Sequence, residues 1–168
     1  PIGVTPAAPT MPIPCTSGRC AVHTLDSFPD LAGLHQANPR RYPHLLESVA
    51  HGTPQARYDI LFAFPGNTLS LDACGRLHWP EGALTGDFLT ALDQVWRDAS
   101  QAGAPQADGA VPFTGGWLLY LGYELAHTIE PASALAPPAG DMPLAFATRF
   151  PAAIIRDHAH QRTHLVCE

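Results

Sequence analysis

Three glycines interrupt an aromatic, strand-like run at residues 112–124 (PFTGGWLLYLGYE), and this run limits the possible folds more than any other part of the chain. A glycine inside a strand costs packing and chain entropy, and it is usual where another backbone, a side chain or a ligand approaches closely. Gly115, Gly116 and Gly122 therefore predict a tight junction around a strand at 115–124. A bulged core strand without a binding role satisfies the same pattern.

Hydrophobic periodicity predicts an α+β fold with a mostly antiparallel sheet and two principal helices. The helices are expected at 29–37, with Asp26 or Ser27 as the N-cap, and at 86–102, with Thr85 as the N-cap. Apolar residues recur at helical spacing in the second helix and are expected in the core: Phe88, Leu89, Leu92, Val95, Trp96 and Ala99. Because strands and helices alternate irregularly, a doubly wound parallel sheet is not expected.

Strands are expected in eight places, bounded by turn residues. They lie at 23–25, 42–48, 59–64, 68–71, 77–79, 115–124, 144–157 and 163–167, with a hairpin turn at 158–161 and a short helix at 125–129. The strands between 42 and 71 read as a meander. The stretch 144–157 reads as one long strand that forms a hairpin with 163–167.

The chain is long enough for one domain with a sizeable core. Its 168 residues begin with a segment, 1–19, that contains five prolines and is expected to be extended or disordered, because proline is excluded from helix interiors and from strand ladders. The domain is therefore expected to occupy residues 20–168.

Charge and composition exclude several classes of function. The net charge of −6 opposes binding to nucleic acid or to an anionic membrane, and no apolar run reaches the roughly 18 residues of a membrane span. The nine basic residues are all arginine, so lysine chemistry is absent. Residues 1–14 lack the charged start and apolar centre of a signal peptide, and a cytoplasmic protein is expected.

No familiar catalytic motif or metal motif occurs in the chain, and no catalytic or metal-binding residue is predicted. The four cysteines are expected to be free thiols, because their number is low for a secreted scaffold. Cys15, Cys20 and His23 are not accompanied by a second pair of Cys or His residues at zinc-ligand spacing, which a four-ligand zinc site would need. His158 and His160 flank the expected hairpin turn and are interpreted as solvated side chains.

Several motifs, in order, resemble one family. They are YPHLLES at 42–48, RYDI at 57–60, the run at 112–124, DMP at 141–143 and AIIRDH at 153–158. From residue 42 to 168 the chain resembles the N-terminal domain of the chorismate-using synthases, aminodeoxychorismate synthase component I and anthranilate synthase component I. RYDIL at 57–61 is more similar to the aminodeoxychorismate branch than to the Arg-Tyr-Ser-Phe form of anthranilate synthases.

The chain departs from the family pattern at two places in the glycine run. Trp117-Leu118-Leu119 replaces a stretch of small residues, and Glu124 stands where aspartate is common. These departures concern local packing. Within this motif the resemblance assigns a structural role to Gly115, Gly116, Gly122 and Tyr123.

A candidate ligand site follows from the first two motifs. The carboxylate of Glu47 can bind an ammonium group, and the hydroxyl of Ser48 can form a hydrogen bond with a backbone amide. The guanidinium of Arg57 can bind a carboxylate through two parallel hydrogen bonds. An amino acid carries the groups that all three side chains would bind. An ordinary Arg57–Glu47 ion pair explains the same residues. The resemblance implies that Leu46, Glu47, Ser48 and Arg57 line a tryptophan pocket between this domain and a C-terminal chorismate-binding domain.

The resemblance also implies the activity of the complete protein. That activity is amination of chorismate to 4-amino-4-deoxychorismate, for 4-aminobenzoate and folate, with Mg²⁺ in the C-terminal domain and ammonia from a glutamine amidotransferase subunit, component II. This chain carries no cofactor site of its own and is expected to be inactive alone. The alternatives are the N-terminal domain of anthranilate synthase component I and a non-catalytic amino-acid-binding module.

Overall fold

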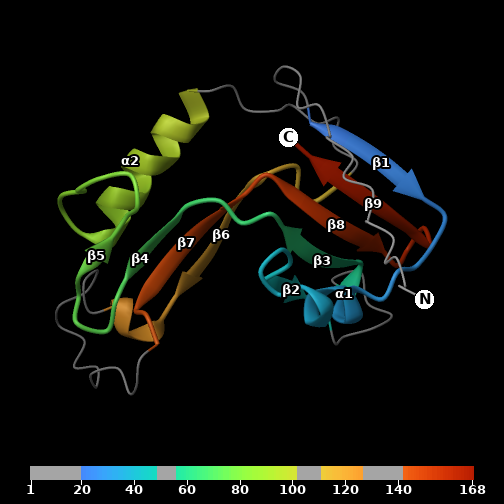
Figure 1. Cartoon of the computed structure of the whole chain (residues 1–168), viewed down its shortest axis with the longest axis horizontal. Coiled ribbons are helices and arrows are strands. Elements are labelled where there is room, and N and C mark those ends of the chain that lie inside the picture. Colours follow the sequence, from blue (N-terminus) through green and yellow to red (C-terminus); the bar gives the residue numbers. More distant parts are fainter. Residues whose placement is uncertain (1–19, 49–55, 102–110, 127–141) are drawn as a thin grey trace, which may run out of the picture.

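The described part of the chain forms two antiparallel sheets and two α-helices, whose arrangement Figure 1 shows. The computed structural model describes residues 20–48, 56–101, 111–126 and 142–168. The five-stranded sheet has the order β1 (Ala21–Leu25), β9 (Arg162–Cys167), β8 (Ala152–Asp157), β3 (Tyr58–Ala63) and β2 (His44–Leu46). The four-stranded sheet has the order β5 (Leu77–His78), β4 (Thr68–Leu71), β7 (Ala145–Phe150) and β6 (Gly116–Leu121). The predicted α+β class with two principal helices is confirmed.

Five expected features fall wholly or partly outside the described residues. They are the segment 1–19, the turn expected at 50–54 between the strands 42–48 and 59–64, residue 102 of the second predicted helix, residues 127–129 of the short helix, and Asp141 of the DMP motif. The beginning of that short helix is described, and it is a 3-10 helix, η2, at Tyr123–Leu125.

The single long strand predicted at 144–157 is wrong, because the chain changes sheets in its middle. β7 ends at Phe150 and pairs with β4 and β6, whereas β8 begins at Ala152 and pairs with β3 and β9. Pro151 stands between them and has no N–H to continue a ladder. The predicted hairpin with a turn at 158–161 is confirmed, since β8 and β9 pair across it.

The predicted meander from 42 to 71 is also wrong. β2 and β3 pair in the five-stranded sheet, but β4 pairs with β7 and β5 in the other sheet. Between β3 and β4, Phe64 adopts a positive φ of 58°, and the Gly66 amide donates to the carbonyl of Arg149 at 2.8 Å. This turn carries the chain out of one sheet and into the other.

Aspartates cap both helices, at positions other than those predicted. α1 (Leu31–Ala37) has Asp30 as its N-cap, which accepts a hydrogen bond from the amide of Gly33 at 2.9 Å. α2 (Phe88–Gln101) is preceded by Asp87, whose Oδ1 accepts from the amide of Thr90 at 2.8 Å. Both caps satisfy amides that have no partner within the helix. The backbone amide of Thr90 in turn lowers the pKa of Asp87.

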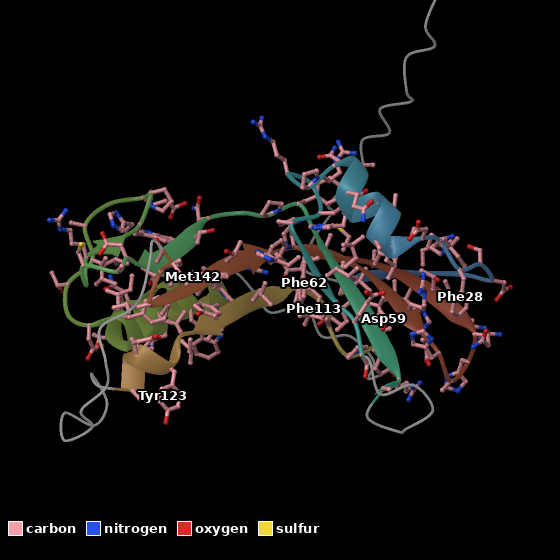
Figure 2. The ribbon with its side chains drawn as sticks, turned by 90° about the horizontal axis from the view of Figure 1, so that it is seen from below. Phe28, Asp59, Phe62, Phe113, Tyr123 and Met142 are labelled. Atoms are coloured by element: carbon pink, nitrogen blue, oxygen red, sulfur yellow. The ribbon has the colours of Figure 1, made fainter. Side chains whose placement is uncertain are left out.

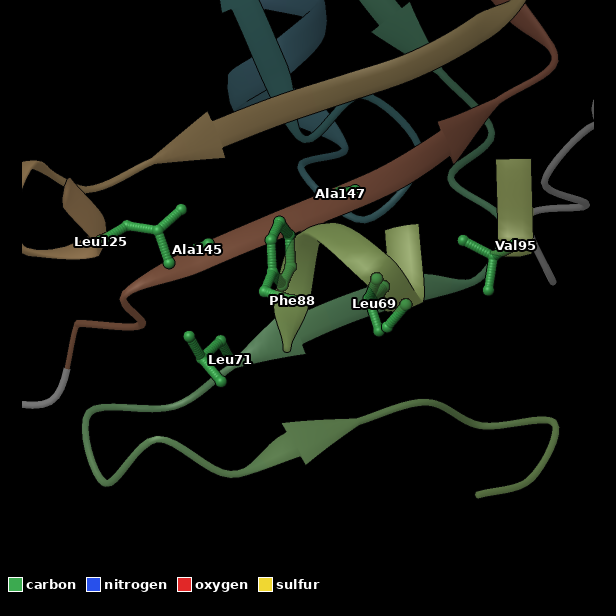
Figure 3. Close-up of a cluster of buried hydrophobic side chains, with 8 residues drawn as sticks. Leu69, Leu71, Phe88, Val95, Leu125, Ala145 and Ala147 are labelled. Carbon is green, nitrogen blue, oxygen red and sulfur yellow. The ribbon is translucent and has the colours of Figure 1, made fainter. Parts of the chain in front are cut away.

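One face of the four-stranded sheet packs against α2 (Figure 3). Ala145 and Ala147 of β7 are fully buried there, and their small side chains let the helix approach the strand. Phe88 and Val95 on α2 are buried, as the periodicity predicts, but Leu89 and Trp96 are exposed. The buried cluster consists of Leu69, Leu71, Phe88, Ala91, Val95, Leu125, Ala145 and Ala147.

An aromatic cluster joins the two sheets. Phe150 at the end of β7 lies 5.2 Å, between ring centroids, from Phe62 of β3, and Phe62 lies 5.1 Å from Phe113. His44 of β2 stacks on Phe146 of β7 at 5.9 Å. Burial in this cluster lowers the pKa of His44, because the protonated ring would lose solvation. Phe62 and Phe113 lie close together near the middle of Figure 2.

The glycine run forms the predicted tight junction at the start of β6. Gly115 and Gly116 have φ values of 114° and 151°, which side-chain-bearing residues rarely adopt. A Cβ on Gly115 would meet the carboxylate of Glu168, and a Cβ on Gly122 would lie 2.8 Å from the carbonyl oxygen of Leu144. The three glycines are thus required by backbone conformation or by close approach.

Replacing Gly115 with alanine is expected to lower the free energy of unfolding by more than the roughly 1 kcal/mol due to a positive φ alone. Its Cβ would displace the Glu168 carboxylate from Arg149. Gly116→Ala should cost about that strain alone, because its Cβ would be 3.4 Å from Phe113. Chemical denaturation of each variant measures the losses.

Gly75→Ala is the matched control, since Gly75 has a φ of 75° and its Cβ would meet nothing within 4 Å. An equal loss for Gly115→Ala and Gly75→Ala would show that the contact with Glu168 contributes nothing.

Candidate amino-acid site at the end of the five-stranded sheet

The structure brings the two sequence motifs of the candidate site together at one end of β2 and β3. Leu46 pairs with Ile60 in the strand register, and the amide of Ser48 donates to Oδ1 of Asp59 at 3.3 Å. Arg57 directly precedes β3 at the same end. The pairing of β2 with β3 therefore places residues 46–48 beside residues 57–60.

Arg57 is held by Asp157, at the end of β8. Its Nε donates to Oδ1 at 3.1 Å and its Nη2 donates to Oδ2 at 2.7 Å. The guanidinium also lies over the Tyr58 ring, 4.6 Å from the centroid, and Nη2 is 3.0 Å from Nδ1 of His160. The alternative interpretation, an Arg57–Glu47 ion pair, is therefore wrong, because the anionic partner of Arg57 is Asp157.

The pairing with Arg57 stabilises the charged form of a buried carboxylate. Asp157 is 1% exposed, and it also accepts hydrogen bonds from the amides of Ala159 and His160. The hydrogen bond from Arg57 lowers the pKa of Asp157 far below its usual range, against the opposing effect of burial. The same bond raises the pKa of Arg57.

Asp59, in the middle of this end of the sheet, is a second buried carboxylate. Nε2 of His158 lies 2.7 Å from its Oδ2, and Nη1 of Arg156 lies 3.5 Å from the same oxygen. The rings of Phe28 and His158 meet edge to face, with centroids 6.2 Å apart, and Arg156 lies over the Phe28 ring. His158 is thus bound within the site and is not the solvated turn residue that the sequence suggested.

Asp59 and Asp157 were not among the predicted site residues, although the sequence contains a signal for them. Asp59 interrupts an otherwise apolar strand, YDILFA, and Arg156-Asp157 end the apolar strand AAIIRD. In the structure Asp59 pairs in register with Arg156. Acidic and basic residues in two buried strands therefore predict a paired cluster once the strands are known to be neighbours.

The remaining predicted residues face outward beside this cluster. Leu46 is 50% exposed and Glu47 is exposed, at the end of the edge strand β2. Nη1 of Arg57 makes no hydrogen bond to a described residue, although Nε and Nη2 are engaged. A guanidinium held in this way can bind a carboxylate, and the exposed carboxylate of Glu47 can bind an ammonium group.

The glycine motif lies away from this site, in the four-stranded sheet. Gly115 and Gly116 precede or begin β6, Gly122 follows it, and Tyr123 begins η2 with 79% of its surface exposed. Their contacts are those of the junction described above.

The described residues hold no candidate metal site and no disulfide. Over residues 20–48, 56–101, 111–126 and 142–168, no three or more His, Cys, Asp or Glu side chains are grouped so as to hold a metal ion. Cys20, Cys74 and Cys167, the cysteines within those ranges, form no disulfide. None of the helices in the described part of the chain is long and apolar enough to cross a membrane.

Comparison with known proteins shows which fold the chain shares. No protein-family model matches the sequence. No curated protein matches it. Among solved structures, it is similar to anthranilate synthase component I from Streptococcus pneumoniae TIGR4, with a TM-score of 0.54 and 20% identity over 73% of this chain. The chain spans only 26% of that protein, so the two share a fold over one part of the larger molecule.

Proposed function

We propose that the chain is the N-terminal domain of aminodeoxychorismate synthase component I, a chorismate-using synthase. The complete enzyme would aminate chorismate to 4-amino-4-deoxychorismate, on the route to 4-aminobenzoate and folate. The observation that carries the proposal is the fold shared with anthranilate synthase component I, over 73% of this chain. The motifs at 42–48 and 57–60, which meet at one end of β2 and β3, add to that support.

The RYDIL sequence at 57–61, which resembles the aminodeoxychorismate branch, includes Asp59, and Asp59 contacts Arg156 and His158. A serine at this position, typical of anthranilate synthases, would leave His158 and Arg156 beside an uncharged group in a buried setting. Removing the counter-charge of the half-buried Arg156 guanidinium would cost stability. The RYDI motif and the Arg156-Asp157-His158 sequence therefore form one interdependent set in this chain.

In this proposal the domain binds and the rest of the enzyme catalyses. Leu46, Glu47, Ser48 and Arg57 hold an amino acid, most suitably tryptophan, whose indole is covered by the chorismate-binding domain. That domain also supplies the Mg²⁺ site, and a glutamine amidotransferase subunit supplies ammonia. The proposed cellular location is the cytoplasm.

The isolated chain is expected to consume no chorismate when Mg²⁺ and ammonium are present. The complete protein is expected to convert chorismate to 4-amino-4-deoxychorismate, detected by chromatography and mass spectrometry. Formation of anthranilate would assign the chain to the second candidate, anthranilate synthase component I, to which the solved structure belongs. Chorismate turnover by the isolated chain would contradict the proposed division of labour.

Ser48→Ala and Arg57→Ala in the complete protein are each expected to weaken tryptophan binding about tenfold, measured by calorimetry, while the KM for chorismate stays unchanged. Each variant removes one polar contact to the amino acid. Ser48→Ala is the cleaner change, because Ser48 reaches Asp59 through its backbone amide and the substitution leaves that bond in place.

Arg97→Ala is the matched control, since Arg97 forms an exposed i,i+4 pair with Asp93 on α2. Equal tryptophan affinity in wild type and in both site variants would show that residues 46–48 and Arg57 have only a structural role.

A further inference from the structure

A pocket unrelated to the candidate amino-acid site lies between α2 and the four-stranded sheet. Its volume is about 660 Å³, which is within the usual size for a small-molecule site. The lining comes from the later turns of α2, from the turn before β4, from the segment after β5, and from β6 and β7. Six of the lining residues carry the chemistry: Asn67, Trp79, Glu81, Asp98, Trp117 and Arg149.

Two indoles form the aromatic part of this pocket. The rings of Trp79, just after β5, and Trp117, on β6, have centroids 6.4 Å apart and planes inclined by 37°. Both side chains are half-buried and pack against the core beneath α2. The two rings are therefore held by the core while part of each remains accessible to a ligand.

The charge of the pocket is negative. Glu81 and Asp98 both line it, and Glu81 accepts a hydrogen bond from Nδ2 of Asn67, which fixes one carboxylate. Arg149 also lines the pocket and is positively charged. Its guanidinium forms an ion pair with Glu168 and donates hydrogen bonds to the carbonyls of Gly116 and Phe150 at 2.9 Å. Because the charge of Arg149 is matched by Glu168, the two carboxylates remain uncompensated within the lining.

We propose that this pocket binds a small organic cation, an ammonium compound with apolar substituents. The faces of Trp79 and Trp117 attract a cation through their quadrupoles, and tryptophan is the strongest side chain for this interaction. Glu81 and Asp98 supply the long-range attraction, which dissolved salt screens. An anionic ligand would meet two carboxylates, and a neutral one would gain only the apolar contact.

Choline tests the proposal against its neutral isostere, 3,3-dimethylbutan-1-ol, in which a carbon replaces the charged nitrogen. The experiment uses a Trp96→Phe variant, so that Trp79 and Trp117 of the pocket supply all of the tryptophan fluorescence. Choline is expected to change this fluorescence saturably and to bind at least about fivefold more tightly than the alcohol. The preference is expected to shrink as the salt concentration rises.

Two isosteric variants, Glu81→Gln and Asp98→Asn, are expected to weaken choline binding together by about fivefold while leaving the alcohol unaffected. Asp93→Asn, which removes one negative charge on α2 outside the pocket, as each single variant does within it, should not alter binding. Trp117→Leu should abolish binding; if that variant fails to fold, the carboxamide variants still decide the question. Equal binding of choline and the alcohol, unchanged affinity in the double variant, or no binding of choline at about 50 mM would each overturn the proposal.

Discussion

Replacing Phe150 with alanine is expected to lower the free energy of unfolding by about 4 kcal/mol. The Phe150 side chain is 0% exposed and contacts Phe62 and His44, on two strands of the other sheet. Its removal would leave a cavity where the chain passes from β7 to β8, and the sheets on either side limit how far the cavity can collapse. Urea denaturation followed by circular dichroism measures the loss.

Phe64→Ala provides the matched control, because Phe64 is 47% exposed and lies just beyond β3. Phe64→Ala should lower the free energy of unfolding by well under half as much as Phe150→Ala does. Similar losses in the two variants would show that the aromatic cluster does not couple the sheets. A change in the slope of unfolding against urea concentration for Phe150→Ala would indicate that the sheets then unfold separately.

Replacing Asp157 with alanine is expected to cost about 3 kcal/mol of unfolding free energy at neutral pH. The substitution removes the bidentate ion pair with Arg57. It also removes the acceptor of two hydrogen bonds, from the amides of Ala159 and His160, that stabilise the turn between β8 and β9. Asp157→Asn should cost less, since its amide oxygen still accepts from the turn. Asp93→Ala, which breaks only an exposed pair on α2, should change stability little.

The contribution of Asp157 is also expected to depend on pH in a definite direction. Arg57 lowers the pKa of Asp157 in the folded protein, so the unfolded chain binds a proton at this carboxyl more readily. The stabilisation is therefore complete above the unfolded pKa of about 4 and is lost progressively below it. The difference in stability between wild type and Asp157→Asn should shrink from pH 5 to pH 2. A constant difference over that range would contradict the assigned charge interaction.

Local patterns in the sequence were sufficient for most of the elements. Helical spacing predicted α2 to within two residues at its start and one at its end, and the strands β1, β3, β4 and β9 lie within two residues of the predicted ranges. The turn at 158–161 and the glycine junction before β6 were also predicted. These features depend on side-chain periodicity and on backbone freedom, which neighbouring residues determine.

The partners of the site residues could be predicted only in part. The motifs at 46–48 and 57–60 were recognised together, and the structure places them together. The alternative interpretation paired Arg57 with nearby Glu47, yet its anionic partner is Asp157, 100 residues further along the chain. Charge pairing is chosen by which strands are neighbours, and here β8 lies beside β3.

The sequence by itself determined the α+β class, the principal helices, the hairpin of β8 and β9, and the need for glycine at 115 and 116, because each depends on contacts between residues near in the chain or on the conformation of single residues. Only the tertiary structure decided that the chain changes sheets at Pro151, that Phe62 meets Phe150, and that Trp79 meets Trp117. Those contacts join residues at least 38 positions apart. Local periodicity carries no information about them, since packing of whole sheets against one another selects which distant side chains meet.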